Sequence, residues 1–281
     1  MTSIGETLRA ATARLTEAGI DGARLDARLL LAEALGKDNS WLFNHANDAL
    51  DAGAETAFAA LLEKRLERQP VSLILGRREF WSLDFTVTRD TLAPRPDSET
   101  LIEAVLAELP DRQAPLSLLD LGTGTGCLLL ALLSELPNAS GIGVDVNPST
   151  LAVAQGNAER LGFAARTRFV QSDWWDKVEG RYDVIISNPP YIPSGDIAGL
   201  DPEVARFEPL GALDGGADGL SPYRLLAAGA GRFLAENGIV AFEVGAGQAP
   251  DVAVLLDRSG FPLRAIRRDL AGIERCVVSR R

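Results

Sequence analysis

The chain has 281 residues, of which 46% are hydrophobic and 24% charged, with a formal net charge of −11. The composition is typical of globular proteins, and the length suits one medium domain with a smaller one. The acidity makes nucleic acid an unfavourable partner, because phosphate binding needs a basic surface. No segment approaches the roughly 18 apolar residues of a membrane span, and the N-terminus lacks a signal-peptide core. Two cysteines and one histidine argue against a disulfide framework and a metal centre, so we expect a reduced, cytoplasmic protein.

Residues 1–70 are rich in Ala, Leu, Arg and Glu and predict a small helical bundle. Two segments, "ETLRAATARLTEAG" and "ARLDARLLLAEALG", carry apolar residues at helical spacing and end in glycine. A third, "GAETAFAALLEKRLERQP", stops at Pro70. The separate composition of this region indicates a domain of its own.

Residues 71–97 predict a β-hairpin followed by a stiff link. The segment "REFWSLDFTVTRD" has a partly alternating apolar pattern, and the two prolines of "APRPDSE" favour an extended chain. Asp97 and Ser98 are residue types that cap helices, so we expect them to begin a helix over 98–109.

The region 98–281 predicts an α/β domain, because strands and helices alternate from residue 116 onward. The last two strands are joined by a loop too short for a parallel crossover, so we expect them to pair antiparallel. We expect strands at 116–121, 140–145, 166–170, 182–187, 238–244, 262–268 and 274–280. We expect helices between them at 126–136, 148–161, 221–235 and 247–259.

The stretch "LLDLGTGTGCLLLAL" reads as strand, glycine loop and helix. Glycines in such a loop let the backbone approach a ligand closely, which a merely tight turn would not require. The third glycine comes one residue too early for the NAD fingerprint, and Cys127 stands where that fingerprint has glycine. The loop therefore favours S-adenosylmethionine, which has no pyrophosphate to bind. The loop residues expected to contact it are Gly122, Thr123, Gly124, Thr125 and Gly126.

Acidic residues end the next two predicted strands, where ligands of such sheets bind. Asp145 ends "GIGVD", and its two carboxylate oxygens can accept hydrogen bonds from both ribose hydroxyls. Asp173 and Trp174 follow "RFVQS" and offer an acceptor for the adenine amino group and an apolar face for its ring. Either acid alone is more often a solvated loop residue, so the prediction depends on their combination with the glycine loop.

The fourth strand ends in Asn188-Pro189-Pro190-Tyr191. Asparagine and proline are common in turns, so the four residues alone are a moderate signal. An amide or aryl nitrogen is a poor nucleophile because its lone pair is delocalised. The side-chain carbonyl of Asn188 and the backbone carbonyl of Pro189 can accept its N–H groups and stabilise the developing positive charge. Tyr191 can stack on a planar acceptor group. These residues leave open whether the methyl acceptor is adenine, cytosine or glutamine.

The chain resembles the bacterial release-factor glutamine methyltransferases over almost its whole length. The resemblance rests on "REFWSLDFTV", "PRPDSETL", "DLGTGTGCLLLAL", "SDWW", "NPPYIP", "EPLGALDGGADGL" and "FEVGAGQ". The glycine loop and "NPPY" are shared with many N-methyltransferases, whereas "PRPDSE" and "EPLGALDGGADGL" are specific to the family. The link departs from the family's usual "PRPETE" at Asp97 and Ser98.

The resemblance implies a helical N-terminal domain, a hairpin and a Rossmann-like seven-stranded methyltransferase domain. It implies methyl transfer from S-adenosylmethionine to the glutamine amide of the Gly-Gly-Gln motif in class 1 peptide chain release factors, without metal. The resemblance implies that the cofactor is bound by the loop Gly122–Gly126 and by Asp145, Trp174 and Asn188. It also implies that the segment Asn188–Tyr191 binds the glutamine. We expect the helical domain to recognise the protein substrate, and neither membrane nor nucleic acid to be a partner.

Two alternatives compete with this interpretation. An adenine methyltransferase acting on DNA or RNA uses the same "NPPY" arrangement, but it needs a basic surface for phosphates. An inert interaction module would need neither the glycine loop nor Asn188. The three interpretations are distinguished by incubating the protein with labelled S-adenosylmethionine and either release factor or DNA, and by determining which of the two becomes labelled.

Overall fold

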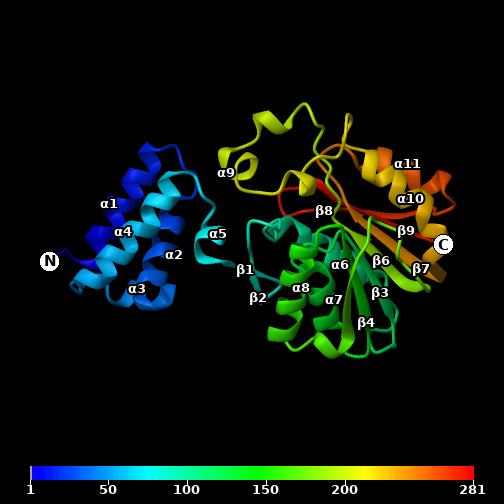
Figure 1. Cartoon of the computed structure of the whole chain (residues 1–281), viewed down its shortest axis with the longest axis horizontal. Helices are drawn as coiled ribbons and strands as arrows, with labels where there is room; N and C mark the ends of the chain where they lie inside the picture. Colours follow the sequence, from blue (N-terminus) through cyan, green and yellow to red (C-terminus); the bar gives the residue numbers. More distant parts are fainter. Residues whose placement is uncertain (1) are drawn as a thin grey trace. The chain divides into compact units, whose positions relative to one another are not determined.

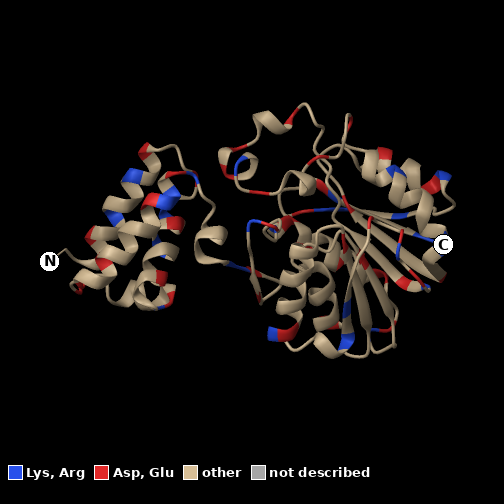
Figure 2. Cartoon of the chain, viewed as in Figure 1, with Lys and Arg blue, Asp and Glu red and all other residues tan. Residues whose placement is uncertain are grey.

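The structure, a computed structural model, describes residues 2–281 and divides into two compact units (Figure 1). The helical unit extends to Gly76 and also contains Asp201–Phe207; the sheet unit comprises Arg77–Leu200 and Glu208–Arg281. Acidic and basic residues are interspersed along both (Figure 2). Among the described residues, no helix is long and apolar enough to cross a membrane.

The helical unit has a core of its own, built mainly from leucine and alanine. Leu15, Leu30, Leu31 and Leu42 are completely or almost completely buried in it, and Phe58 packs with them. Ser3 begins the first helix with a capping box, in which its hydroxyl accepts from the N–H of Glu6 at 3.2 Å. The helices of this unit are α1 (Ile4–Glu17), α2 (Ala23–Leu35), α3 (Asn39–Asn44), α4 (Ala52–Leu66), α5 (Val71–Leu75) and α9 (Pro202–Ala205).

Helix α9 joins this unit through a buried ion-pair network. Arg65 is 6% exposed, and its guanidinium donates to Asp26 at 2.7 Å and to Glu203 at 2.9 Å. Arg68 pairs with the other oxygen of Glu203 at 3.0 Å. A buried guanidinium needs carboxylate partners, and here one partner comes from a segment far along the chain.

The sequence-based limits of this region need two corrections. The predicted helical region ends at residue 70, but α5 continues the unit to Gly76, because Val71, Ile74 and Leu75 pack against its core. The hairpin is therefore shorter than predicted, with β1 (Arg77–Phe80) paired antiparallel to β2 (Leu83–Thr86).

The sheet unit confirms the predicted α/β fold. Its seven strands have the order β5-β4-β3-β6-β7-β9-β8, in which β9 is antiparallel to both neighbours, as predicted for the last pair. The strands are β3 (Ser117–Leu121), β4 (Ser140–Asp145), β5 (Thr167–Gln171), β6 (Tyr182–Ser187), β7 (Leu234–Glu243), β8 (Leu263–Arg268) and β9 (Glu274–Arg280). The main helices are α6 (Glu99–Glu108), α7 (Cys127–Glu135), α8 (Pro148–Arg160), α10 (Ser221–Phe233) and α11 (Ala249–Arg258).

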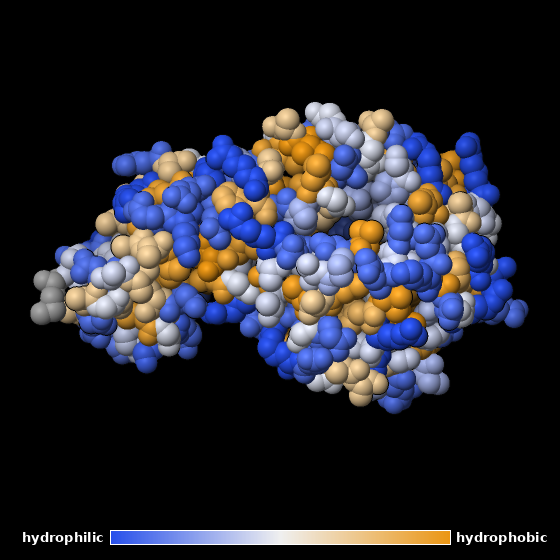
Figure 3. All heavy atoms as spheres, in the orientation of Figure 1, coloured by the Kyte–Doolittle hydropathy of each residue, from blue (hydrophilic) through white to orange (hydrophobic). Residues whose placement is uncertain are grey.

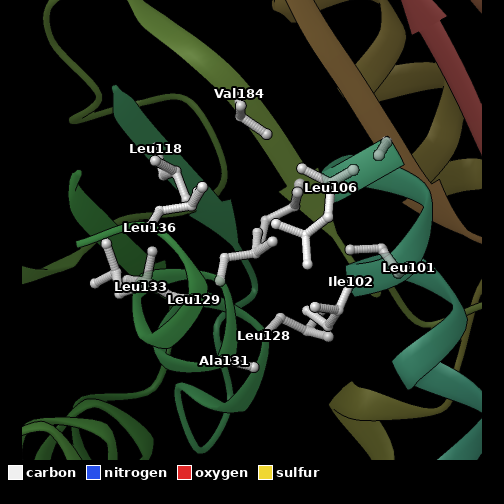
Figure 4. Packing of buried hydrophobic residues seen from close by; sticks show 14 of the residues in the cluster. Leu101, Ile102, Leu106, Leu118, Leu128, Leu129, Ala131, Leu133, Leu136 and Val184 are labelled. Atoms are coloured by element: carbon white, nitrogen blue, oxygen red, sulfur yellow. The ribbon is translucent and has the colours of Figure 1, made fainter. Parts of the chain in front are cut away.

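Alternation along the strands buries both faces of the sheet. Leu118 and Val184 face the layer that contains α6 and α7, where the leucines of these helices interdigitate (Figure 4). Leu119 and Ile185 face the other layer, with α10 and α11. Since successive side chains of a strand point to opposite faces, near-continuous apolar strands are what a doubly covered parallel sheet requires.

The predicted cap of α6 is wrong. The backbone of Ser98 is already helical, with φ −68° and ψ −15°, and its side chain makes no capping hydrogen bond. The helix is preceded instead by a 3-10 turn at Pro96–Ser98, which leaves the Ser98 hydroxyl free to contact Asn188.

Candidate active site

A cavity of about 570 Å³ lies at the carboxyl ends of the central strands of the sheet unit. Parallel sheets place their ligand sites there. Of the residues predicted for the site, it is lined by Gly122, Thr123, Gly124, Thr125, Asp145, Asp173, Trp174, Asn188 and Pro190. Gly126, Pro189 and Tyr191 do not line it.

The glycine loop between β3 and α7 depends on left-handed backbone conformations. Gly122, Gly124 and Gly126 have φ values of 72°, 57° and 81°, which other residues adopt only with strain. The N–H groups of Gly122 and Thr123 both donate to the carbonyl of Val144 at 2.9 Å. These bonds tie the loop to the end of β4 and give it a fixed shape.

Asp145 ends β4 and forms one wall of the cavity. Its carboxylate accepts from the N–H of Gly124 at 3.2 Å and from the N–H of Asn147 at 3.0 Å. Burial raises its pKa, and the backbone hydrogen bonds act in the opposite direction. A carboxylate has about four lone-pair sites, so acceptor capacity remains for a ligand.

Trp174 lies in a strained turn after β5, beside the glycine loop. Its φ is 45°, unusual for a bulky residue. The Ser172 hydroxyl stabilises the turn by donating to the Trp174 carbonyl at 3.0 Å and accepting from the N–H of Lys177 at 2.9 Å. A Cβ at Gly122 would be 3.6 Å from the indole, so the two predicted cofactor-binding segments lie next to each other.

Asn188 follows β6, which pairs with β3 and so lies in the middle of the sheet. Its side-chain nitrogen donates to the Ser98 hydroxyl at 3.4 Å. The carboxyl group of Glu243, at the end of β7, also interacts with both the Ser98 hydroxyl and the Asn188 amide. The Asn188 side chain is therefore held from two neighbouring elements.

The segment after Asn188 is supported by the glycine-rich stretch 211–219. The N–H of Ile192 donates to the carbonyl of Leu213 at 3.0 Å, and the N–H of Gly215 donates back to Ile192 at 2.8 Å. A Cβ at Gly215 would be only 2.8 Å from the Cα of Tyr191. Glycine is therefore required where this stretch crosses the Tyr191 backbone.

A second support joins the extended link to Glu208, just before this stretch. Arg95 donates to both carboxylate oxygens of Glu208, at 2.7 and 2.6 Å. The Glu208 side chain is 3% exposed, and its burial raises its pKa against the effect of Arg95. Arg95 and Pro209, next to Glu208, both line the cavity.

The charged groups that line the cavity are mostly acidic. Arg95 is accompanied by four carboxylates, Asp90, Asp145, Asp173 and Asp214. Such a lining attracts cations and repels phosphates. It suits a ligand that carries a sulfonium and an ammonium group, as S-adenosylmethionine does. Among residues 2–281 there is no cluster of three or more His, Cys, Asp or Glu that could hold a metal ion.

Sequence reasoning missed Glu243 and misassigned Ser98. Glu243 had a detectable signal, because a single acid ends the otherwise apolar run "GIVAFE". No sequence signal marked the role of Ser98, since its contact with Asn188 joins positions far apart in the chain. Asp120, fully buried in β3, was also missed; its carboxylate accepts from the Thr123 hydroxyl at 2.6 Å and so supports the loop.

Two family models match the chain. The one described as "PrmC N-terminal domain" matches residues 6–76, and the one described as "Methyltransferase small domain" matches residues 97–198. Among solved structures, a methyltransferase from Pyrococcus furiosus has a TM-score of 0.51 at 18% identity, covering 70% of this chain and 88% of that one. The Thermus thermophilus 16S rRNA N2 G1207 methyltransferase also has a TM-score of 0.51, at 20% identity, covering 73% of this chain and 49% of that one. These two likenesses show the fold alone.

Curated relatives decide the family. The release factor glutamine methyltransferase of Rhodospirillum rubrum is 48% identical over 278 residues, which is 99% of this chain and 85% of the relative. The proteins of the same name from Cereibacter sphaeroides and Agrobacterium fabrum are 48% and 43% identical, over 98% and 99% of this chain and 97% and 98% of their own lengths. The resemblance seen in the sequence is thus confirmed, and the chain belongs to the release factor glutamine methyltransferase family.

Proposed function

We propose that this protein transfers a methyl group from S-adenosylmethionine to the side-chain amide nitrogen of the glutamine in the Gly-Gly-Gln motif of class 1 peptide chain release factors. One observation carries the proposal. Asn188 lines the same acidic cavity as the glycine loop and Asp145, in a chain that is 48% identical to a release factor glutamine methyltransferase. We expect the protein to act in the cytoplasm, where release factors work.

The residues of the cavity fit the cofactor. The loop from Gly122 to Gly126 would lie against its amino-acid and ribose parts, and Asp145 would accept from the ribose hydroxyls. Asp173 and Trp174 would hold the adenine, by one acceptor and one apolar face. When bound, the cofactor supplies an electrophilic methyl group, so the protein itself needs to provide only binding and orientation.

Asn188 and its neighbours would handle the glutamine. An amide nitrogen becomes nucleophilic when its N–H groups are bound and its lone pair is aimed at the methyl carbon. The Asn188 side-chain carbonyl and the Pro189 backbone carbonyl would accept the two N–H bonds, and they would stabilise the nitrogen as it gains positive charge. Pro190 limits backbone motion, and Tyr191 would pack against the planar amide. Orientation of this kind supplies much of the rate acceleration without a covalent intermediate.

The helical unit would recognise the protein substrate. A groove of about 530 Å³ in it is lined by Arg9, Arg24 and Arg28 and by apolar side chains of α1 and α3, with no acidic residue among the lining residues. Phe43, at its edge, is 81% exposed, which is unusual for a large aromatic residue. Exposed apolar side chains of the protein also appear among hydrophilic ones in Figure 3. A groove with these properties fits an acidic segment of a protein that carries an apolar side chain.

Methyl transfer from labelled S-adenosylmethionine to purified release factor tests the proposal. We expect label in the release factor, lost when the glutamine of the Gly-Gly-Gln motif is replaced. Label in DNA or RNA instead would establish the adenine methyltransferase, and binding to release factor without any transfer would establish the interaction module. The acidic cavity lining disfavours the first alternative, since a nucleic-acid substrate would bring phosphates to it.

A further inference from the structure

Glu243 is a buried carboxyl group beside the proposed active site, and the chemistry described above does not use it. It is 2% exposed and ends an apolar strand. Among the described residues, its Oε2 atom has no hydrogen-bond partner. A buried carboxyl with an unsatisfied oxygen is costly to the fold, so a role in the function is the better explanation for it.

The sheet places Glu243 next to Asn188. Strands β6 and β7 are parallel neighbours with Ser187 opposite Phe242, so Asn188, just after β6, lies at the level of Glu243, the last residue of β7. The Glu243 carboxyl interacts with the Ser98 hydroxyl and the Asn188 amide. The Asn188 nitrogen also donates to the Ser98 oxygen at 3.4 Å. A carboxyl, a hydroxyl and an amide thus form one connected group.

This group determines which way the Asn188 amide faces. A carboxylate only accepts hydrogen bonds, so it takes the NH₂ group of Asn188. A hydroxyl that donates to the carboxylate presents its oxygen to the same NH₂ group. The carbonyl oxygen of Asn188 is then directed away from both, and only that oxygen can accept an N–H from an incoming amide.

We propose that Glu243 is a positioning residue, which together with Ser98 fixes the Asn188 side chain so that its carbonyl oxygen faces the substrate glutamine. The inference rests on the proposed methyl transfer. A protonated Glu243 would lose this effect, because its O–H donates and can bind the Asn188 carbonyl oxygen instead. The orientation of Asn188 should therefore depend on pH.

The surroundings of Glu243 set the pH range. Burial raises its pKa to about 7; the Ser98 hydroxyl, Arg275 on β9 and the Asn188 amide lower it, and Asp97 raises it. Tyr191, Tyr223, Cys127 and Cys276 also interact electrostatically with it. Their pKa values are raised above their ordinary values of 9 to 10, so they stay neutral while Glu243 titrates.

Single-turnover methyl transfer to release factor at saturating cofactor tests the inference. The wild-type rate should fall as the pH is lowered through about 7. Glu243→Gln should be slower by about tenfold or more at the alkaline end, by analogy with residues that orient metal ligands, and should show no fall near neutral pH. Its cofactor affinity, measured by calorimetry, should be unchanged.

Glu243→Asp should restore the pH dependence. Glu236→Gln, which removes an exposed charge from the same strand, is the matched control and should behave as wild type.

A second measurement does not need the substrate. In ¹H–¹⁵N spectra the side-chain NH₂ resonance of Asn188, assigned with Asn188→Ala, should titrate near pH 7 in the wild type and in Glu236→Gln, but not in Glu243→Gln. Absence of this titration in the wild type, or its persistence in Glu243→Gln, overturns the inference. If the titration is present but no release factor is methylated at any pH, the proposed function fails and the positioning of Asn188 stands. If Glu243→Gln does not fold, Ser98→Ala takes its place in the test. The titration of the Asn188 resonance should then be present in the wild type and lost in Ser98→Ala.

Discussion

Gly219 packs directly against the backbone carbonyl of Tyr191, so closely that a Cβ at position 219 would overlap the carbonyl oxygen. Its φ of 73° is in the left-handed region. The Gln248 side chain donates to the same carbonyl at 2.9 Å. The glycine-rich stretch, which the sequence marks as specific to the family, thus sets the position of the Asn188–Tyr191 segment.

Gly219→Ala should therefore impair both stability and turnover. The left-handed conformation costs an alanine about 1–2 kcal/mol, and the overlap with Tyr191 adds about 1–3 kcal/mol. Gly247→Ala is the control, because Gly247 has φ 83° but no atom within 4 Å of its Cβ position. Urea unfolding should show a larger loss of unfolding free energy for Gly219→Ala than for Gly247→Ala. Gly219→Ala should also transfer methyl more slowly. Equal losses for the two variants would mean that the contact with Tyr191 has no energetic importance.

Asp145→Ala should weaken cofactor binding. The change removes the proposed partner of the ribose hydroxyls and also an acceptor for the N–H of Gly124. Loss of a hydrogen bond to a charged group costs about 1.5–3 kcal/mol, so the affinity should fall about tenfold or more. Calorimetry with S-adenosylmethionine measures it, with the exposed Asp111→Ala as control. An affinity equal to that of the wild type would remove Asp145 from the cofactor site.

Asn188→Ala should act mainly on the transfer step. It removes one proposed acceptor for the glutamine N–H groups, which by analogy with an oxyanion-hole donor should cost about 10²–10³ in rate. Asn188→Asp keeps an oxygen of the same size but adds a negative charge near the sulfonium, so it should transfer slowly while binding cofactor more tightly than Asn188→Ala. Single-turnover rates at saturating cofactor measure both. A wild-type rate for Asn188→Ala would reduce Asn188 to a turn residue.

The arginines of the helical groove should determine the affinity for the protein substrate. Arg24→Glu combined with Arg28→Glu reverses the charge of the groove, so KM for intact release factor should rise about tenfold or more, which corresponds to about 1.4 kcal/mol. Turnover of a short Gly-Gly-Gln peptide, already weak because it lacks remote contacts, should not change. Arg14→Glu is the control, since Arg14 is ion-paired with Glu63 and does not line the groove. Equal KM values for all three proteins would exclude the groove as a docking surface.

Asp120 should make the stability depend on pH. Burial raises its pKa to about 7 from 3.8, an effect that Asp145 strengthens and the Thr123 hydroxyl opposes. The folded protein therefore keeps a proton that the unfolded chain releases, and stability falls as the pH rises from about 4 to about 7. Asp120→Asn should remove this pH-dependent loss of stability, which is on the order of a few kcal/mol. Urea unfolding on either side of neutral pH measures it, with exposed Asp257→Asn as control. A wild-type pH dependence in Asp120→Asn would show that Asp120 is ionised in the folded protein.

Local patterns in the sequence were enough to predict the sheet unit and most of its candidate site. The signals were local: apolar runs of strand length, helical spacing between them, and a glycine loop, acids and an asparagine at the points where strands end. Because parallel strands end at one edge of a sheet, local order along the chain was enough to bring Gly124, Asp145, Trp174 and Asn188 to one cavity.

The distant residues that support that site could be identified only in the folded chain. The contact of Asn188 with Ser98, the place of Glu243 beside both, and the ion pair of Arg95 with Glu208 each join segments far apart in the chain. Residue types did not reveal them: Ser98, for example, reads as a helix cap. The physical reason is that a buried polar group must find a partner somewhere in the folded chain, and its sequence neighbours do not specify which one.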